Sequence, residues 1–180
     1  HLVRRPDGLP KQDDFAVVEI ALPDAAEGEV QIEAVFVSVD PYMRTRLDVD
    51  QPLGAAMLGG GIGRVVQSRH AGFREGDIVR HAAGMRERFI SKGDNLTVIR
   101  RDPALDLSVY MHALGSTGLT AYGGLLSVGA LREGEQVFVS TAAGAVGSVA
   151  AQIAKIKNCY VVGATGSAEK ATWLKDHVKL

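Results

Sequence analysis

The sequence contains little cysteine and almost no net charge. A single cysteine, Cys159, excludes a disulfide framework and a cysteine-rich zinc module, and it suits a reducing compartment. Lysine and arginine number 20 and aspartate and glutamate 21, so the net charge is −1, which offers no basic surface to nucleic acid. We therefore expect a cytoplasmic protein with no nucleic-acid partner.

Long uninterrupted hydrophobic runs are also missing. Residues 107–131 and 136–154 carry no charged side chain and approach the length of about 20 residues that a membrane-spanning helix needs. Glycines interrupt both stretches, so we expect no membrane span. The chain opens on His1 with neither a methionine nor an apolar signal segment, which predicts that it does not begin at a natural start.

The residue patterns of two common enzyme classes are absent as well. His70, His81, His112 and His177 have no paired helical spacing and no neighbouring thiolate, so we expect no metal site. No Gly-x-Ser-x-Gly motif is present, which weighs against a hydrolase.

The first hundred residues contain short apolar runs separated by glycine-rich turns. Residues 30–36 alternate apolar and polar side chains, which is typical of a strand with one buried face, and residues 15–22 form a run rich in Val and Ile. Asp40-Pro41 ends the alternation and leaves room for one helical turn over 41–46. Further strands are expected at 64–68, 78–80, 89–90 and 96–99. Together these elements predict a small barrel.

A glycine cluster, Gly59-Gly60-Gly61-Ile62-Gly63, resembles a phosphate-binding loop in composition. Such a loop needs a helix directly after it, whereas Arg64-Val65-Val66 is strand-like. We favour a packing role, in which glycine allows two backbones to approach closely, and the nucleotide loop is the alternative.

Beyond residue 115 the apolar spacing changes to three and four. Ser116 or Thr117 is the expected cap of a helix that ends at Gly129. Next come an expected strand at 137–140, a helix at 145–157, a strand at 159–163 and a helix at 168–178. On the helix at 145–157, one face is formed by Val146, Val149, Ala150, Ile153 and Ile156. This order is that of the first part of a dinucleotide-binding fold.

The glycine turn of this unit reads Ala142-x-Gly144-x-x-Gly147. In the dinucleotide fingerprint, a glycine at position 144 lets the backbone approach a pyrophosphate, and one at 147 lets the helix pack on the strand. The helix then offers its unpaired N–H groups to the anion. The alternative is a packing turn with no ligand.

The end of the second strand favours NADP over NAD. An NAD site usually places Asp or Glu there to hold the ribose 2′-hydroxyl, but residues 163–166 contain no acid. Ser167 and Lys170 follow, and a hydroxyl with an ammonium suits a 2′-phosphate. The alternative for Lys170 is a solvated lysine on a helix face.

Three stretches together resemble a known family. They are Asp40-Pro41-Tyr42-Met43-Arg44, residues 115–122 (GSTGLTAY) and residues 140–148 (STAAGAVGS). The resemblance is to the medium-chain dehydrogenase/reductase superfamily, in its zinc-independent branch of NADPH-dependent alkenal/one double-bond reductases, which includes prostaglandin reductase and curcumin-reductase-like enzymes. Zinc-dependent members carry a Cys and a Gly-His-Glu stretch for the metal, and the corresponding place here is the glycine cluster at 59–63.

The resemblance implies a fold of class α/β plus β. Residues 1–112 would be a GroES-like substrate and catalytic domain, and residues 113–180 the start of an NADP-binding Rossmann domain with a doubly wound parallel sheet. Such a sheet has about six strands, and this sequence supplies about two before Leu180, so we expect a truncated domain and a chain that is part of a longer one.

The resemblance also implies roles for individual residues. Ser116 would approach the nicotinamide, and Tyr42 would lie on the substrate side, with packing of the turn after Asp40 as its alternative. The expected pyrophosphate loop consists of Gly144, Ala145, Val146 and Gly147.

The activity implied is hydride transfer from NADPH to the β-carbon of a small-molecule enone or alkenal. The full-length protein would be a homodimer. Two alternatives stay open: an NADPH-dependent quinone reductase of the same superfamily, and a non-catalytic fragment.

Overall fold

The structure is a computed structural model that describes residues 1–180, and these residues form two compact units. The first unit is His1–Asp102 and the second is Pro103–Leu180. The expected division of function between 1–112 and 113–180 stays a prediction.

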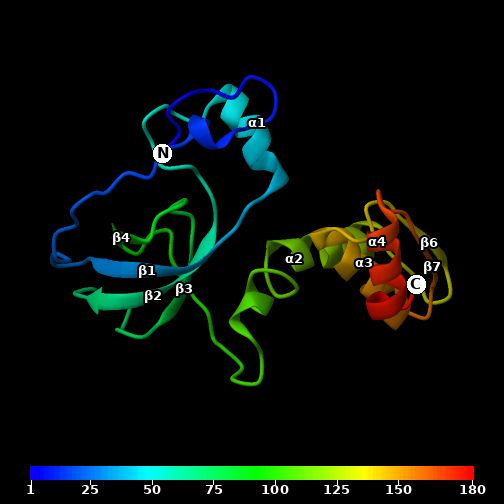
Figure 1. Cartoon of the computed structure of the whole chain (residues 1–180). Helices are drawn as coiled ribbons and strands as arrows, with labels where there is room; N and C mark the ends of the chain where they lie inside the picture. Colours follow the sequence, from blue (N-terminus) through cyan, green and yellow to red (C-terminus); the bar gives the residue numbers. More distant parts are fainter. The chain divides into compact units, whose positions relative to one another are not determined.

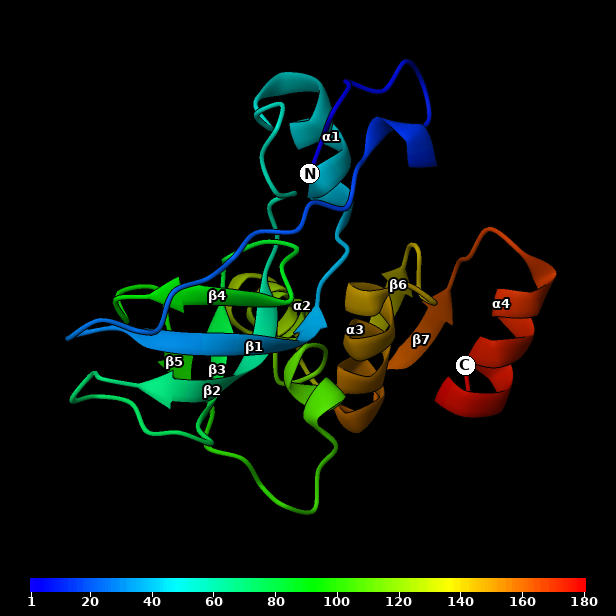
Figure 2. The same cartoon turned by 60° about the vertical axis from the view of Figure 1, so that its left-hand side comes forward.

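The first unit is built on a five-stranded antiparallel sheet with the order β4-β1-β2-β3-β5 (Figures 1 and 2). Its strands are β1 Val30–Val37, β2 Gly61–Ser68, β3 Ile78–His81, β4 Arg88–Ser91 and β5 Thr97–Val98. The alternation expected at 30–36 buries Val30 and Ile32, but two register shifts against β2 leave Phe36 exposed. The core comprises Val30, Ile32, Val65, Val79 and Phe89.

The glycine cluster at 59–63 has the packing role that the sequence favours. Gly61 begins β2, and a Cβ there would lie 2.5 Å from the carbonyl oxygen of Phe36 on the neighbouring strand. A Cβ on Gly63 would lie 2.9 Å from the carbonyl oxygen of Glu33. Since no helix follows the cluster, the nucleotide-loop alternative is excluded.

Helix α1, Pro41–Val49, is longer than the single turn expected at 41–46. Its polar face explains the extension, because Arg44 pairs with Asp48 at 2.6 Å and Arg46 with Asp50 at 2.6 Å, each four residues apart. Figure 1 shows α1 beyond one end of the sheet, beside the N-terminus. There the small cluster Leu2, Met43, Leu47 and Met57 holds helix and terminus together.

The apolar run at 15–22 does not form a strand, which corrects the sequence interpretation. Its pairing is limited to one isolated bridge between Leu2 and Phe15, and Val17 is fully exposed. In Figure 1 this segment leads from the N-terminal region to β1 without joining the sheet. A strand needs a neighbour to accept its backbone hydrogen bonds, and the five-stranded sheet does not include this run.

The second unit contains a parallel pair of strands, β6 and β7, joined through helix α3. Its elements are a 3₁₀ turn Leu107–Tyr110, α2 Ser116–Tyr122 continued by a π-helical segment Gly123–Val128, β6 Gln136–Val139, α3 Ala145–Ile156, β7 Tyr160–Gly163, and α4 Ala168–Trp173 continued by a π-helical segment Leu174–Val178. The core comprises Val139, Ala142, Ala151, Leu174 and Val178. The outer sheet face exposes Phe138 and Tyr160 by 69% and 68%. This strand–helix–strand–helix order confirms the start of a Rossmann sheet.

Two details of the second unit differ from expectation. Helix α2 is capped by Gly115 rather than by Ser116 or Thr117, and the Thr117 hydroxyl instead donates to the carbonyl of His112 at 2.8 Å. The buried face of α3 contains the small residues Ser148, Ala151 and Ala154, whereas Val146 and Ile156, on the expected apolar face, are exposed. Small side chains allow the close approach of helix and strand that this fold requires.

Across the whole chain, no helix combines the length and the apolar character needed to cross a bilayer.

Candidate cofactor-binding site

A hollow of about 250 Å³ lies at the carboxyl ends of β6 and β7. The strands run parallel with Val139 opposite Gly163, so the loops that follow them meet at one edge of the sheet. Ligands of open α/β sheets bind at this edge. The hollow is lined by Thr141, Ala143, Gly144, Ala164, Thr165, Gly166 and Lys170.

Backbone hydrogen bonds hold the two loops together. The N–H of Ala142 donates to the carbonyl of Ala164 at 2.9 Å, and the N–H of Ala164 donates to Val139 at 2.9 Å. Within the first loop, the N–H of Gly144 donates to the carbonyl of Thr141 at 2.8 Å. Thr141 has a φ of 51°, which is unusual for a β-branched residue and is tolerated where the surrounding structure enforces it.

Gly147 is required by this loop. A Cβ at this position would lie 2.9 Å from the Cα of Ala142 and closer still to the carbonyl oxygen of Thr141. Such distances are below those of real Cβ contacts, so the first turn of α3 packs on the loop only if residue 147 has no side chain.

The N-terminus of α3 is open to a ligand. Its cap is Gly144, which has no side chain with which to close the helix end. The backbone N–H groups of Ala145, Val146 and Gly147 therefore have no protein acceptor, and the helix dipole places partial positive charge there. An anion such as a pyrophosphate fits this arrangement.

Of the two residues expected to contact a 2′-phosphate, only Lys170 lines the hollow. Lys170 lines the hollow, and its ammonium has neither an ion pair nor a hydrogen bond with the protein. Ser167 does not line the hollow; it caps α4, where its Oγ accepts from the N–H of Lys170 at 3.3 Å. The predicted contact of Ser167 with a phosphate stays a prediction.

Thr165 is one of the lining residues that the sequence analysis did not assign to the site. It lies two positions beyond the end of β7, is half-buried, and has no hydrogen-bonded partner for its hydroxyl. The sequence feature that could have pointed to Thr165 is a hydroxyl side chain just after the second strand, where an NAD site carries an acid.

Ser116 and Tyr42 are not among the residues that line this hollow. Ser116 is the exposed first residue of α2, in the same unit, and does not line the hollow. Tyr42 belongs to the first unit, in the first turn of α1, with 48% of its surface exposed. Both roles stay predictions.

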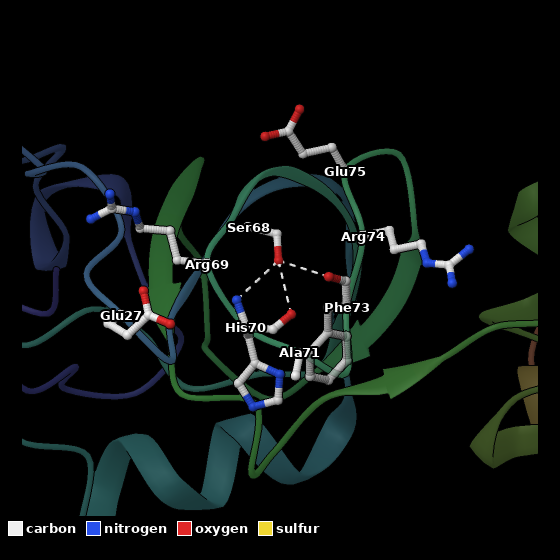
Figure 3. Close-up of a pocket in the computed structure, with 8 residues that line it drawn as sticks. All are labelled: Glu27, Ser68, Arg69, His70, Ala71, Phe73, Arg74 and Glu75. Carbon is white, nitrogen blue, oxygen red and sulfur yellow. Dashed lines mark hydrogen bonds between the residues drawn. The ribbon is translucent and has the colours of Figure 1, made fainter.

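A second hollow, of about 520 Å³, lies in the first unit around the turn that follows β2 (Figure 3). The hydroxyl of Ser68 donates to the carbonyl of Phe73 at 2.7 Å, and the rings of His70 and Phe73 pack with their centroids 5.0 Å apart. Figure 3 shows the Arg69 and Arg74 head groups pointing away from each other. These contacts build a turn, and the charges do not converge on a ligand.

The first unit also holds a buried histidine. His81 is 3% exposed; its Nδ1 accepts from the N–H of Ala83 at 3.3 Å, and its Nε2 has no partner. Burial lowers the pKa of His81 from its ordinary value of 6.5, so the ring is neutral at pH 7. Nowhere in the chain do three or more His, Cys, Asp or Glu side chains gather in a group able to hold a metal ion.

Comparison with known proteins places this geometry in a family. Residues 1–99 match the family model described as the N-terminal domain of oxidoreductase. The chain belongs to the medium-chain dehydrogenase/reductase superfamily. Prostaglandin reductase 1 of Bos taurus is 43% identical over 172 residues, which cover 94% of this chain and 52% of the relative. The NADPH-dependent curcumin reductase of Escherichia coli is 40% identical over 176 residues, which cover 94% and 50%.

A solved structure has the same fold as this chain. CurA of Vibrio vulnificus in complex with NADPH is 35% identical, with a TM-score of 0.90 over 99% of this chain and 55% of that one. The resemblance inferred from three sequence stretches is thus confirmed, together with the GroES-like and partial Rossmann fold class. The chain spans about half the length of the curated relatives that it matches.

Proposed function

We propose that the whole protein reduces the carbon–carbon double bond of α,β-unsaturated ketones or aldehydes, with NADPH as the reductant. The similarity to prostaglandin reductase 1 and to an NADPH-dependent curcumin reductase supports this activity. The reaction consumes one enone, one NADPH and one proton, and it yields the saturated carbonyl compound and NADP⁺.

The hollow at β6 and β7 is the observation that carries the proposal, because its groups suit NADP. The free N–H groups of Ala145, Val146 and Gly147, reached over Gly144, would hold the pyrophosphate. Lys170, with no protein partner, would hold the 2′-phosphate. No acidic side chain lines the hollow to repel that phosphate.

When bound, NADPH supplies the hydride that reaches the β-carbon of the substrate. The chain's own contribution would be to fix the cofactor through the groups above, and the family resemblance supports Ser116 at the nicotinamide end and Tyr42 on the substrate side. Negative charge develops on the substrate oxygen during this reduction, and a hydrogen-bond donor there stabilises it. Residues 1–112 would form the substrate side and residues 113–180 the cofactor side.

The setting of the whole protein is also part of the proposal. The low cysteine content supports a cytoplasmic location. The family resemblance supports a homodimer that acts on a small molecule, with no nucleic-acid partner and no membrane insertion.

Product analysis with labelled cofactor tests the activity. NADPH that carries deuterium on the transferable position is incubated with 4-phenylbut-3-en-2-one, and the product is identified by NMR, with NADH as the control reductant. Because the chain spans about half of its relatives, the assay uses the 180-residue chain alongside a chimera that joins it to the remaining part of Vibrio CurA. We expect a saturated ketone with deuterium on the β-carbon.

Other products would contradict this proposal. An allylic alcohol would show reduction of the carbonyl instead. Turnover of a quinone but not of the enone would favour a quinone reductase. A folded chimera without turnover, together with a 180-residue chain that fails to bind NADPH, would favour the non-catalytic alternative.

A further inference from the structure

We propose that the hydroxyl of Thr165, together with Lys170, selects the 2′-phosphate of the cofactor. Thr165 would take the role that the sequence analysis expected of Ser167. This inference rests on the proposed use of NADPH. It adds a specificity-determining residue that lies outside the glycine fingerprint and acts in addition to Lys170.

The position of Thr165 follows from the strand that precedes it. Strand β7 ends at Gly163, and the N–H and carbonyl of Ala164 are both bonded to the β6 side, to Val139 and Ala142 at 2.9 Å each. Ala164 and Thr165 both line the hollow, and Thr165 is the first residue after β7 that brings a hydroxyl to it. This is the place where a dinucleotide fold reads the ribose 2′-position.

The hydroxyls of Thr165 and Ser167 differ in their hydrogen bonds within the protein. Ser167 is exposed, lies outside the lining, and accepts the N–H of Lys170 as the cap of α4. Thr165 is half-buried in the lining, and its hydroxyl has no partner in the protein. A half-buried hydroxyl without a protein partner is free to donate to a ligand oxygen.

The charge of the hollow determines the kind of ligand. Lys170 is the one charged residue in the lining, and the nearby Glu169 is not part of it. A 2′-phosphate offers oxygens to both the ammonium and the Thr165 hydroxyl, and hydrogen bonds to ionised groups are the stronger kind. A plain ribose 2′-hydroxyl carries no charge for Lys170 to bind.

Calorimetric titration of the 180-residue chain with 2′,5′-ADP and with 5′-AMP isolates this contact. Thr165→Val keeps the side-chain shape and removes the hydroxyl, while Thr165→Ser retains the hydroxyl. We expect T165V to weaken 2′,5′-ADP binding about ten-fold, with 5′-AMP binding unchanged and T165S close to the parent chain. Thermal unfolding of each variant shows whether the fold is kept.

The matched variants are Ser167→Ala and Lys170→Met. We expect S167A to lower the melting temperature through loss of the cap and to keep 2′,5′-ADP affinity within two-fold, whereas K170M weakens it. Unchanged 2′,5′-ADP binding in T165V, or a ten-fold loss in S167A, would overturn the inference. If the parent chain binds 5′-AMP and 2′,5′-ADP equally, the 2′-phosphate site is refuted. If it binds neither of these nor NADPH, the proposed cofactor site itself fails.

Discussion

At the scale of a single residue, burial of His81 makes the stability of the fold depend on pH. Its ring is buried against Phe89, with centroids 4.8 Å apart, and its Nε2 lies 2.7 Å from where a Cβ of Gly61 would be. Because burial lowers the pKa of His81 in the folded state, the unfolded chain binds a proton below about pH 6.5 that the folded chain does not. Stability is therefore fully present above pH 6.5 and falls as the pH drops through that value.

We expect His81→Gln to flatten this dependence between pH 7 and pH 5.5. The melting temperatures of both proteins across this range provide the measurement. The other titratable groups are common to the two proteins, so the difference between the two slopes isolates residue 81. Parallel slopes would show that burial of His81 does not govern the pH dependence.

At the scale of an element, the turn between β6 and α3 depends on Gly147. We expect Gly147→Ala to destabilise the second unit by about 1–3 kcal/mol, because the new methyl group meets the backbone of Thr141 and Ala142. Urea unfolding followed by the fluorescence of Trp173, the single tryptophan, measures this unit. Gly166→Ala is the matched control, since its Cβ would meet no atom within 4 Å. Equal effects of both substitutions would refute the steric explanation.

The same elements show what local sequence can and cannot predict. Strand–turn–helix–strand order and the place of Gly147 follow from patterns within a few residues, so 135–163 was predicted well. The run at 15–22 has the composition of a strand, but whether a neighbour is available is a tertiary fact. Helix α3 is apolar on most sides, and its buried face is decided by how closely Ala151 must approach the strands.

In the candidate site, too, some residues could be predicted from local sequence and others depend on the folded geometry. The fingerprint identified Gly144, and the missing acid after the second strand pointed to Lys170; the structure brings both residues to one hollow. Thr165 belongs to no motif, and its presence there depends on where β7 ends. The cap formed by Ser167 is also a matter of geometry, because a serine before a helix reads equally well as a ligand or as a cap.

At the scale of the whole molecule, the chain segment that connects the two units is a candidate site for proteolytic cleavage. Residues 100–106 are exposed and contain Arg100 and Arg101, whereas residues 102–131 contain no lysine or arginine. We expect limited trypsin digestion to cut first after these arginines and to leave two resistant fragments, identified by mass spectrometry. First cleavage within α1, after Arg44 or Arg46, would contradict this two-unit organisation.

The parallel pairing of β6 and β7 also constrains the order in which the second unit folds. Val139 and Gly163 face each other although they are 24 positions apart, and α3 occupies most of the chain between them. Closing a loop of this length costs on the order of 3 kcal/mol of chain entropy, and no hairpin turn can lower that cost. We therefore expect strand β7 to gain its hydrogen bonds after α3 has shortened the path, and the rate of folding to follow the helix propensity of α3.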